Sequence, residues 1–261
     1  IRTGDAERPA STPRPVSSLL LGAAFGVSCH VQPVFLVVLL GYLGIEVWRR
    51  SDRARWGSAA IVLLGAFLVS IPWGVRNYRT FDAVFFVRSN LGLELRMGNH
   101  EGATANISDP HFNDWPPHPR THASDARKIQ EMGEVPYMRE SGRQALEWIE
   151  SHPAEFTRLT AQRIRYFWLG PTDDPVMAIA FLALAALAAV GAVLALRRLP
   201  AAGSAVLLIP LLTYPLIYYL VPWQHRYRFP IEWILFLLAG AALWSLSGLG
   251  DARSERSGQP Q

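Results

Sequence analysis

Four long apolar runs constrain this chain more than any other feature of its sequence. Each run holds about 20 residues, which is enough for a helix to cross about 30 Å of hydrocarbon. The runs are Gly57–Val75, Val176–Leu196, Gly203–Val221 and Phe229–Gly248. Half of the 261 residues are hydrophobic and 18% are charged, which excludes a disordered chain, and the single cysteine excludes a disulfide scaffold. The sequence therefore predicts a polytopic membrane protein.

Two shorter apolar segments precede the first of these runs. Val16–His30 and Val34–Trp48 are separated by Gln32 and Pro33. Proline interrupts a helix and keeps the residue before it away from helical conformation. We expect two broken or antiparallel helices here, of which the first need not be a complete span. The predicted fold class is mainly α, a transmembrane helical bundle with about six membrane segments.

Arginines in the short connections predict how the chain crosses the membrane, because cytoplasmic loops carry an excess of Lys and Arg. They fill three places: Arg49, Arg50, Arg53 and Arg55 in one connection, Arg197 and Arg198 in another, and Arg253 and Arg256 in the tail. With these on the cytoplasmic side, we expect a multi-pass protein of the inner (plasma) membrane. The predicted order is a cytoplasmic linker (1–15), transmembrane helices (16–75), an external, periplasmic segment (76–175), transmembrane helices (176–248) and a cytoplasmic tail (249–261).

The basic charge of the chain does not indicate nucleic-acid binding. The formal net charge is +4, yet residues 75–175 hold 12 basic and 14 acidic side chains, a net of −2. The remaining excess of +6 therefore lies in short segments between apolar runs. This distribution is typical of membrane topology and not of a phosphate-binding face.

The external segment is too long for a simple linker and predicts a small α/β cap. Ala83–Arg88 and Leu91–Met97 carry strand-forming residues around Ser89-Asn90, which favours a hairpin. Ser124–Glu150 predicts one or two helical pieces, broken near Gly133–Pro136. A further helix is expected to begin at Pro153, since proline suits the first helical position.

Histidines and carboxylates in the same segment raise the question of a metal. The residues concerned are His100, His111, His118 and His122, with Glu101, Asp109 and Asp114 nearby. The histidine spacings of 11, 7 and 4 match no compact zinc pattern. We assign no metal site and no certain cofactor, and leave a divalent cation open.

Two polar motifs flank predicted span ends on the external side. The loop Trp223-Gln-His-Arg226-Tyr227-Arg228 carries two arginines where few cations are expected. Either these arginines reach lipid phosphates by snorkelling, or they hold the phosphate of a lipid-linked substrate. Arg76 and Asn77 offer donors at a similar depth, as an aromatic anchor or as ligands of a phosphate or a sugar hydroxyl. Arginine suits phosphate because its planar fork donates two hydrogen bonds and stays charged.

Several short motifs occur together in a specific order along the chain. They are Pro72-Trp73-Gly-Val-Arg76-Asn77-Tyr78, Arg88-Ser-Asn90-Leu-Gly92-Leu-Glu94-Leu, Gly98-Asn99, Gly133-Glu134 with Tyr137, His152-Pro153 with Phe156, Phe167-Trp168, Tyr218-Tyr219 and His225-Arg226-Tyr227-Arg228-Phe-Pro230-Ile-Glu232. Through these motifs the sequence resembles the bacterial membrane glycosyltransferases of family 39 in the GT-C superfamily, relatives of protein O-mannosyltransferases and of the aminoarabinose transferase. The resemblance covers nearly everything from about Ser17 to Leu249. It departs from the family at Gln32, where a basic residue is usual before the proline.

The resemblance implies transfer of a sugar from a polyprenyl-phosphate donor to an acceptor at the outer face of the membrane. It places the catalytic carboxylate in a first external loop upstream of Ile1, so we expect this chain to be the C-terminal part of a longer enzyme and inactive alone. The catalytic residue is therefore unknown here. The expected substrate-binding residues are Arg76, Asn77, Tyr78, Glu94, Asn99, Arg226, Tyr227 and Arg228. Glu232, one helical turn after Arg228, is expected to pair with it because a lone buried carboxylate is costly.

Two other functions stay open at this point. One is a non-catalytic polytopic protein that assembles cell-envelope machinery through its external cap. The other is a ligase or polymerase of lipid-linked glycans, which would share the outward arginines. An acidic pair in the upstream loop would favour the transferase, and a start codon directly before Ile1 would favour the non-catalytic protein. The expected partners are the lipid bilayer, a polyprenyl-phosphate sugar and an acceptor (lipid, glycan or protein) of unknown identity, without nucleic acid.

Overall fold

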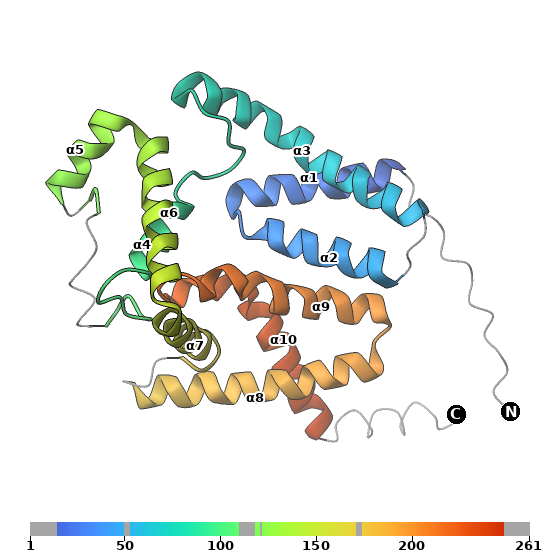
Figure 1. The fold of residues 1–261 in the computed structure, drawn as a ribbon. Coiled ribbons are helices and arrows are strands. Elements are labelled where there is room, and N and C mark those ends of the chain that lie inside the picture. The colour runs from blue at the N-terminus through green and yellow to red at the C-terminus, as the bar shows by residue number, and fades with distance from the viewer. Residues whose placement is uncertain (1–14, 50–52, 110–117, 121, 171–173, 248–261) are drawn as a thin grey trace, which may run out of the picture. The chain divides into compact units, whose positions relative to one another are not determined.

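The structure is a computed structural model that describes residues 15–49, 53–109, 118–120, 122–170 and 174–247. Nearly all of these residues lie in helices or in the short connections between them (Figure 1). The chain divides into two compact units, Ile1–Arg88 and Ser89–Gln261. Each unit is described by itself below.

The first unit contains three helices: α1 (Pro15–Val31), α2 (Phe35–Arg49) and α3 (Arg53–Phe81). A turn at Gln32–Val34 separates α1 from α2, so the break that Pro33 predicts is confirmed. The helix α3 continues past the predicted end of the apolar run at Val75 by more than one turn. The polar motif that contains Arg76 is therefore still helical.

Glycines bring α1 and α3 into backbone contact. A Cβ atom added at Gly22 would lie 2.0 Å from the carbonyl oxygen of Val62, and one added at Gly65 would lie 2.3 Å from that of Leu19. Small residues at such crossings let two helix backbones approach closely within a membrane. The close packing of α1 on α3 therefore depends on glycines, which have no side chain, at the point where the two helices cross.

Replacement of Gly65 by leucine is expected to lower the stability of the first unit by about 2 kcal/mol, because a side chain there cannot fit without separating the helices. Thermal unfolding of the purified protein in detergent measures the effect. Gly57 is the matched control on the same helix, since a Cβ atom there would meet nothing within 4 Å. A Gly57→Leu variant as unstable as Gly65→Leu would contradict the explanation.

The second unit begins with four helices of the predicted external segment. They are α4 (Leu91–Gly98), α5 (Ala123–Met132), α6 (Glu134–Ser151) and α7 (Pro153–Leu169). The predicted break near Gly133 and the predicted helix start at Pro153 are both confirmed. The buried Asp125 connects three of these helices, because it accepts a hydrogen bond from Tyr137 Oη at 2.8 Å and lies 3.7 Å from Arg96 Nη1.

The predicted hairpin, and with it the α/β cap, is wrong. Residues 91–98 form the helix α4, and the described residues contain no strand, only an isolated parallel bridge between Asn106 and Trp223. The alternation of residues in this stretch resembled a strand, but the buried Leu93 and Met97 are one helical turn apart and pack on Tyr137. Gly92 explains the choice, because a Cβ atom there would lie 2.0 Å from the Met138 carbonyl oxygen of α6. The cap is helical.

The remaining helices of the second unit are α8 (Pro175–Arg198), α9 (Ala201–Thr213) and α10 (Phe229–Leu246). The 3₁₀ turns η2 (Tyr214–Tyr219) and η3 (His225–Tyr227) lie between α9 and α10. The helix α10 runs across α8 (Figure 1), with a close contact at Gly191, where a Cβ atom would lie 2.0 Å from the Leu238 carbonyl oxygen.

Four helical stretches of the described residues are long and apolar enough to cross a membrane. They are Arg55–Phe81, Pro175–Arg198, Ala201–Tyr219 and Phe229–Leu246. Only 22% to 33% of the residues in their apolar windows are buried within the protein, as expected where side chains face lipid. The four long runs are thus confirmed as helices, whereas six spans are not supported. At 1.5 Å per residue the 17 residues of α1 and the 15 of α2 fall short of about 30 Å.

Candidate functional site

Residues 220–228 connect η2 to α10, and backbone hydrogen bonds hold this segment against the loop after α4. Trp223 N donates to the Ala105 carbonyl oxygen at 2.7 Å, and Ile107 N donates to the Trp223 carbonyl oxygen at 3.2 Å. The Trp223 ring is buried and lies 5.8 Å from the ring of Tyr166 on α7. The segment is therefore positioned by the helical cap as well as by the spans that it joins.

Arg163 is a buried residue of this region that the sequence analysis missed. It is 0% exposed, and its Nη1 donates to Asn99 Oδ1 at 3.2 Å while its Nη2 donates to the Gly98 carbonyl oxygen. Burial lowers the pKa of Arg163 to about 10. A signal was present in the sequence, since Arg163 lies four residues from Leu159 and from Phe167, in the middle of the apolar face of α7.

Asn99 links Arg163 to the connecting segment 220–228 by hydrogen bonds. Its Nδ2 donates to the Leu95 carbonyl oxygen at 2.7 Å and to the Leu220 carbonyl oxygen at 2.9 Å. With its Oδ1 bound to Arg163, the buried amide is fully engaged. The expected role of Asn99 as a substrate ligand is therefore replaced by a structural one: it joins α4 and α7 to the start of the 220–228 segment.

Arg228 points into the second unit and not toward solvent. Its Nε donates to Glu232 Oε1 at 3.0 Å, so the ion pair that the sequence predicts is present. Its Nη1 lies 3.4 Å from the Phe167 carbonyl oxygen, and its guanidinium lies 3.8 Å from the ring centroid of Phe181. Burial lowers the pKa of Arg228, and the Glu232 carboxylate acts in the opposite direction. At 2% exposure Arg228 anchors the segment and is not an accessible phosphate ligand.

His225 and Arg226 are exposed in this segment and Tyr227 is partly buried, and Glu94 of α4 acts electrostatically on Tyr227. Arg226 is exposed, and its guanidinium lies 5.6 Å from the ring centroid of Tyr227. The Tyr227 ring stacks on Tyr218 of η2 at 4.4 Å and 23°. Burial, assisted by the negative charge of Glu94, raises the pKa of Tyr227 to about 12, against a hydrogen bond with Arg226. The structure thus brings together three predicted site residues from two distant parts of the sequence.

Glu94 is itself oriented by its own helix. Asn90 Nδ2 donates to Glu94 Oε1 at 3.2 Å, one helical turn away, and the Glu94 side chain is partly buried. This arrangement exists only because residues 91–98 are helical. Tyr227 therefore lies beside the Arg226 guanidinium and within the electrostatic influence of the Glu94 carboxylate; we call these three residues the Arg226 cluster (Glu94, Arg226 and Tyr227).

The other predicted site residues lie in the last turns of α3, in the first unit. Asn77 is 1% exposed, and its Nδ2 donates to the Phe85 carbonyl oxygen at 2.8 Å, so it fixes the chain after α3. Arg76 is exposed, donates from Nη1 to Asn77 Oδ1 at 3.0 Å and lies 4.9 Å from the ring centroid of Trp73. Tyr78 is 56% exposed. Whether Arg76 meets the Arg226 cluster stays a prediction, because the two belong to separate units.

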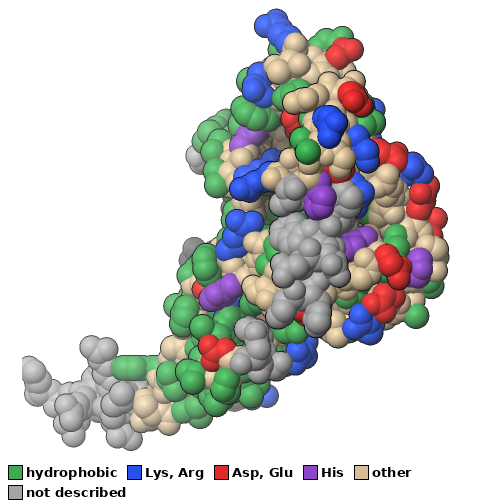
Figure 2. Space-filling view, turned by 90° about the vertical axis from the view of Figure 1, so that its left-hand side faces the viewer, with side chains coloured by type: hydrophobic (Ala, Val, Ile, Leu, Met, Phe, Trp, Pro, Cys, Tyr) green, Lys and Arg blue, Asp and Glu red, His purple; other side chains and the backbone are tan. Residues whose placement is uncertain are grey.

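The histidines of the external segment do not form a metal site in the described part of the chain. No group of three His, Cys, Asp or Glu side chains there could hold a metal ion. His111 and Asp114 lie outside the described residues. One ring nitrogen of His118 already accepts a hydrogen bond from the backbone, since Arg120 N donates to His118 Nδ1 at 3.0 Å. On the side of the second unit formed by α5 and α6, acidic and basic side chains are mixed, with histidines among them (Figure 2).

His100 is expected to make the protein less stable in acid. Burial lowers the pKa of His100 below 6.5, so the unfolded chain binds more protons than the folded one as the pH falls through 6.5. The free energy of unfolding should therefore decrease between pH 7 and pH 5, and the decrease should be smaller in His100→Gln. Thermal unfolding at both pH values, with His122→Gln as control, measures this. An unchanged pH dependence in His100→Gln would refute the prediction.

Comparison with known proteins adds no relative from which a function could be transferred. No family model matches the sequence, and no curated protein or solved structure is significantly similar to it.

Proposed function

We propose that this chain forms part of a membrane glycosyltransferase that moves a sugar from a polyprenyl-phosphate donor to an acceptor at the outer face of the membrane. The observation that carries the proposal is the Arg226 cluster: an exposed guanidinium beside a tyrosine and a carboxylate, on a segment whose other arginine is buried. The order of the short motifs, which resembles that of family 39, supports the same function.

The position of the cluster along the spans fits a lipid phosphate. The segment 220–228 begins where one candidate span ends at Tyr219 and stops where the next begins at Phe229. Side chains of this segment therefore lie near headgroup depth, where the phosphate of a polyprenyl lipid is found. Snorkelling to ordinary lipid phosphates explains the exposure of Arg226. It does not explain why a carboxylate and a tyrosine accompany it, and a sugar attached to the phosphate requires such partners.

Each member of the cluster has a role that follows from its chemistry. Arg226 binds the phosphate and stabilises the negative charge that grows on it as the glycosidic bond breaks. Tyr227 keeps its proton at neutral pH because its pKa is raised to about 12, so it donates a hydrogen bond to a phosphate or sugar oxygen. Glu94 accepts hydrogen bonds from sugar hydroxyls. The transfer also needs a base that removes the proton of the acceptor, and the resemblance implies that this base lies in the upstream loop.

Arg76 and Tyr78 supply a second set of donors from the end of α3, and Asn77, Asn99 and Arg228 position the segments that carry the ligands. The helices α1 and α2 act as two incomplete membrane segments, giving about six in all. The cap of α4–α7 lies on the periplasmic side of the inner membrane. No cofactor is assigned, and a divalent cation stays open.

A transfer assay with the full-length protein tests this function. The protein, in nanodiscs, is incubated with a panel of radiolabelled polyprenyl-phosphate sugars and membrane extracts, and the labelled product is identified. One sugar transferred from its polyprenyl phosphate to a lipid, glycan or protein supports the proposal. Joining of whole lipid-linked glycans would assign the protein to the ligases and polymerases. Absence of transfer from every donor, with the protein recovered in a complex with other envelope proteins, would favour the non-catalytic alternative.

A further inference from the structure

An apolar groove with a cavity volume of about 600 Å³ opens between α8, α9 and α10, at the end of the bundle opposite to the Arg226 cluster. Its position follows from the packing of α8 and α10, which touch at Gly191 and Leu238. From this contact the lining extends along α8 to Arg198 and along α10 to Trp244. Within a membrane such a space is filled by lipid or by protein, because protein interiors leave few voids.

One charged side chain lines this groove. The guanidinium of Arg198 is exposed and donates from Nη2 to Ser245 Oγ at 3.1 Å. In the described part of the chain Arg198 forms no ion pair with a carboxylate, and Arg197 beside it adds a second positive charge. Trp244 is half exposed, and tryptophan at such a position lies at headgroup depth. A hydrocarbon channel with an arginine at its mouth is complementary to an acyl chain with a phosphate at its end.

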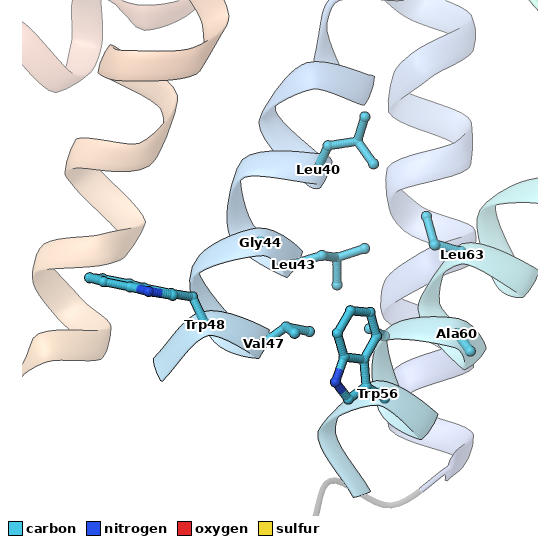
Figure 3. A pocket seen from close by; sticks show the side chains of 9 residues that line it. Leu40, Leu43, Gly44, Val47, Trp48, Trp56, Ala60 and Leu63 are labelled. Atoms are coloured by element: carbon cyan, nitrogen blue, oxygen red, sulfur yellow. The ribbon is translucent and has the colours of Figure 1, made fainter. Parts of the chain in front are cut away.

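The first unit contains an apolar groove that lacks this charge. It has a cavity volume of about 660 Å³ between α2 and α3. Leu40, Leu43 and Val47 face Trp56, Ala60 and Leu63 across it (Figure 3). No charged residue lines it, and Arg55 next to Trp56 is paired with Glu46. An apolar wall combined with a guanidinium that forms no ion pair among the described residues therefore distinguishes the groove at Arg198.

We propose that the groove between α8 and α10 binds an anionic phospholipid, with one acyl chain along the helices and the phosphate on Arg198. Two hydrogen bonds from the guanidinium fork suit a phosphodiester. By the arginine rule this end of the spans lies in the cytoplasmic leaflet, where anionic lipids are attracted to basic residues at membrane-proximal positions. The lipid site is separate from the site of sugar transfer and does not depend on it.

Lipid retention by the full chain in detergent tests the proposal, with native mass spectrometry as the readout. The probes are phosphatidylglycerol and phosphatidylcholine with identical acyl chains. The wild-type protein is expected to retain phosphatidylglycerol about fivefold more strongly, and Arg198→Gln is expected to remove this preference while leaving phosphatidylcholine unchanged. Gly240→Leu, which places a side chain in open space of the groove, is expected to reduce retention of both lipids severalfold.

Ala189→Leu is the matched control, because it introduces the same leucine side chain at an exposed position of α8 that does not line the groove. Equal retention of the two lipids by the wild-type protein, or an unchanged preference in Arg198→Gln, would overturn the proposal. So would equal losses in Gly240→Leu and Ala189→Leu. If the first unit, the C-terminal tail or a second copy fills the groove, no lipid will be retained and Gly240→Leu will have no effect, which also overturns it.

Discussion

Replacing Arg226 by alanine is expected to lower the rate of sugar transfer by the full-length enzyme at least about 100-fold. The guanidinium is the accessible positive charge of the Arg226 cluster, and donors placed on developing charge typically contribute that much to catalysis. Arg226→Lys keeps the charge without the planar fork, so its loss should be smaller. Initial rates with a saturating polyprenyl-phosphate sugar measure the effect.

Arg127 on α5 is the matched control for this experiment. It is exposed like Arg226, and it lies outside the 220–228 segment and α4. Arg127→Ala should therefore retain the wild-type rate. Near-normal turnover in Arg226→Ala would refute the phosphate role of Arg226, and with it the central support for the proposed function.

Replacing Arg163 by alanine is expected to lower the free energy of unfolding by about 3–5 kcal/mol. The change leaves a large cavity inside the cap and deprives two buried acceptors, the Gly98 carbonyl and Asn99 Oδ1, of their donor. Arg163→Lys retains the charge but cannot reach both acceptors, so an intermediate loss is expected. Thermal or denaturant unfolding in detergent measures stability.

A second measurement separates the positioning role of Arg163 from a general loss of stability. Once Arg163 is removed, Asn99 no longer holds the Leu220 carbonyl firmly, and amide exchange should accelerate in residues 220–228 before it does in α8. Arg158 on the same helix is the control, since it is exposed and forms an ion pair with Glu155 at the surface. Arg158→Ala should change stability by less than about 1 kcal/mol. Uniform acceleration over the whole second unit would contradict the positioning role.

The elements that the sequence predicted correctly are those fixed by local chemistry. The long apolar runs, the break at Pro33, the break near Gly133 and the helix start at Pro153 each follow from a few neighbouring residues. The helix α4 could not be predicted in this way. Its eight residues fit both the two-residue repeat of a strand and the 3.6-residue repeat of a helix. Its conformation is decided by contact with α6, nearly 50 residues away, where Gly92 meets the Met138 carbonyl.

The candidate site shows the same division between local and distant causes. The sequence marked Arg226 and Arg228 equally, although the structure exposes the first and buries the second against Glu232 and Phe181. Arg226 lies in the 3₁₀ turn η3 and Arg228 directly follows that turn, and only the packing of the surrounding helices decides which of the two is buried. The polarity of Asn77 and Asn99 predicts that they bind substrate. In the structure their amide groups donate hydrogen bonds to backbone carbonyl oxygens, and the sequence does not indicate which carbonyls need such a donor.

The hydrogen bonds that hold residues 220–228 in place affect the free energy of binding a lipid headgroup. Leu220 is held through Asn99, Trp223 through Ala105 and Ile107, and Arg228 through Glu232. The conformational entropy of this stretch is therefore lost when the protein folds, and little remains to be lost when a headgroup arrives. Mutations in the cap that make residues 220–228 more mobile should therefore weaken headgroup binding, even where the mutated residue does not contact the ligand.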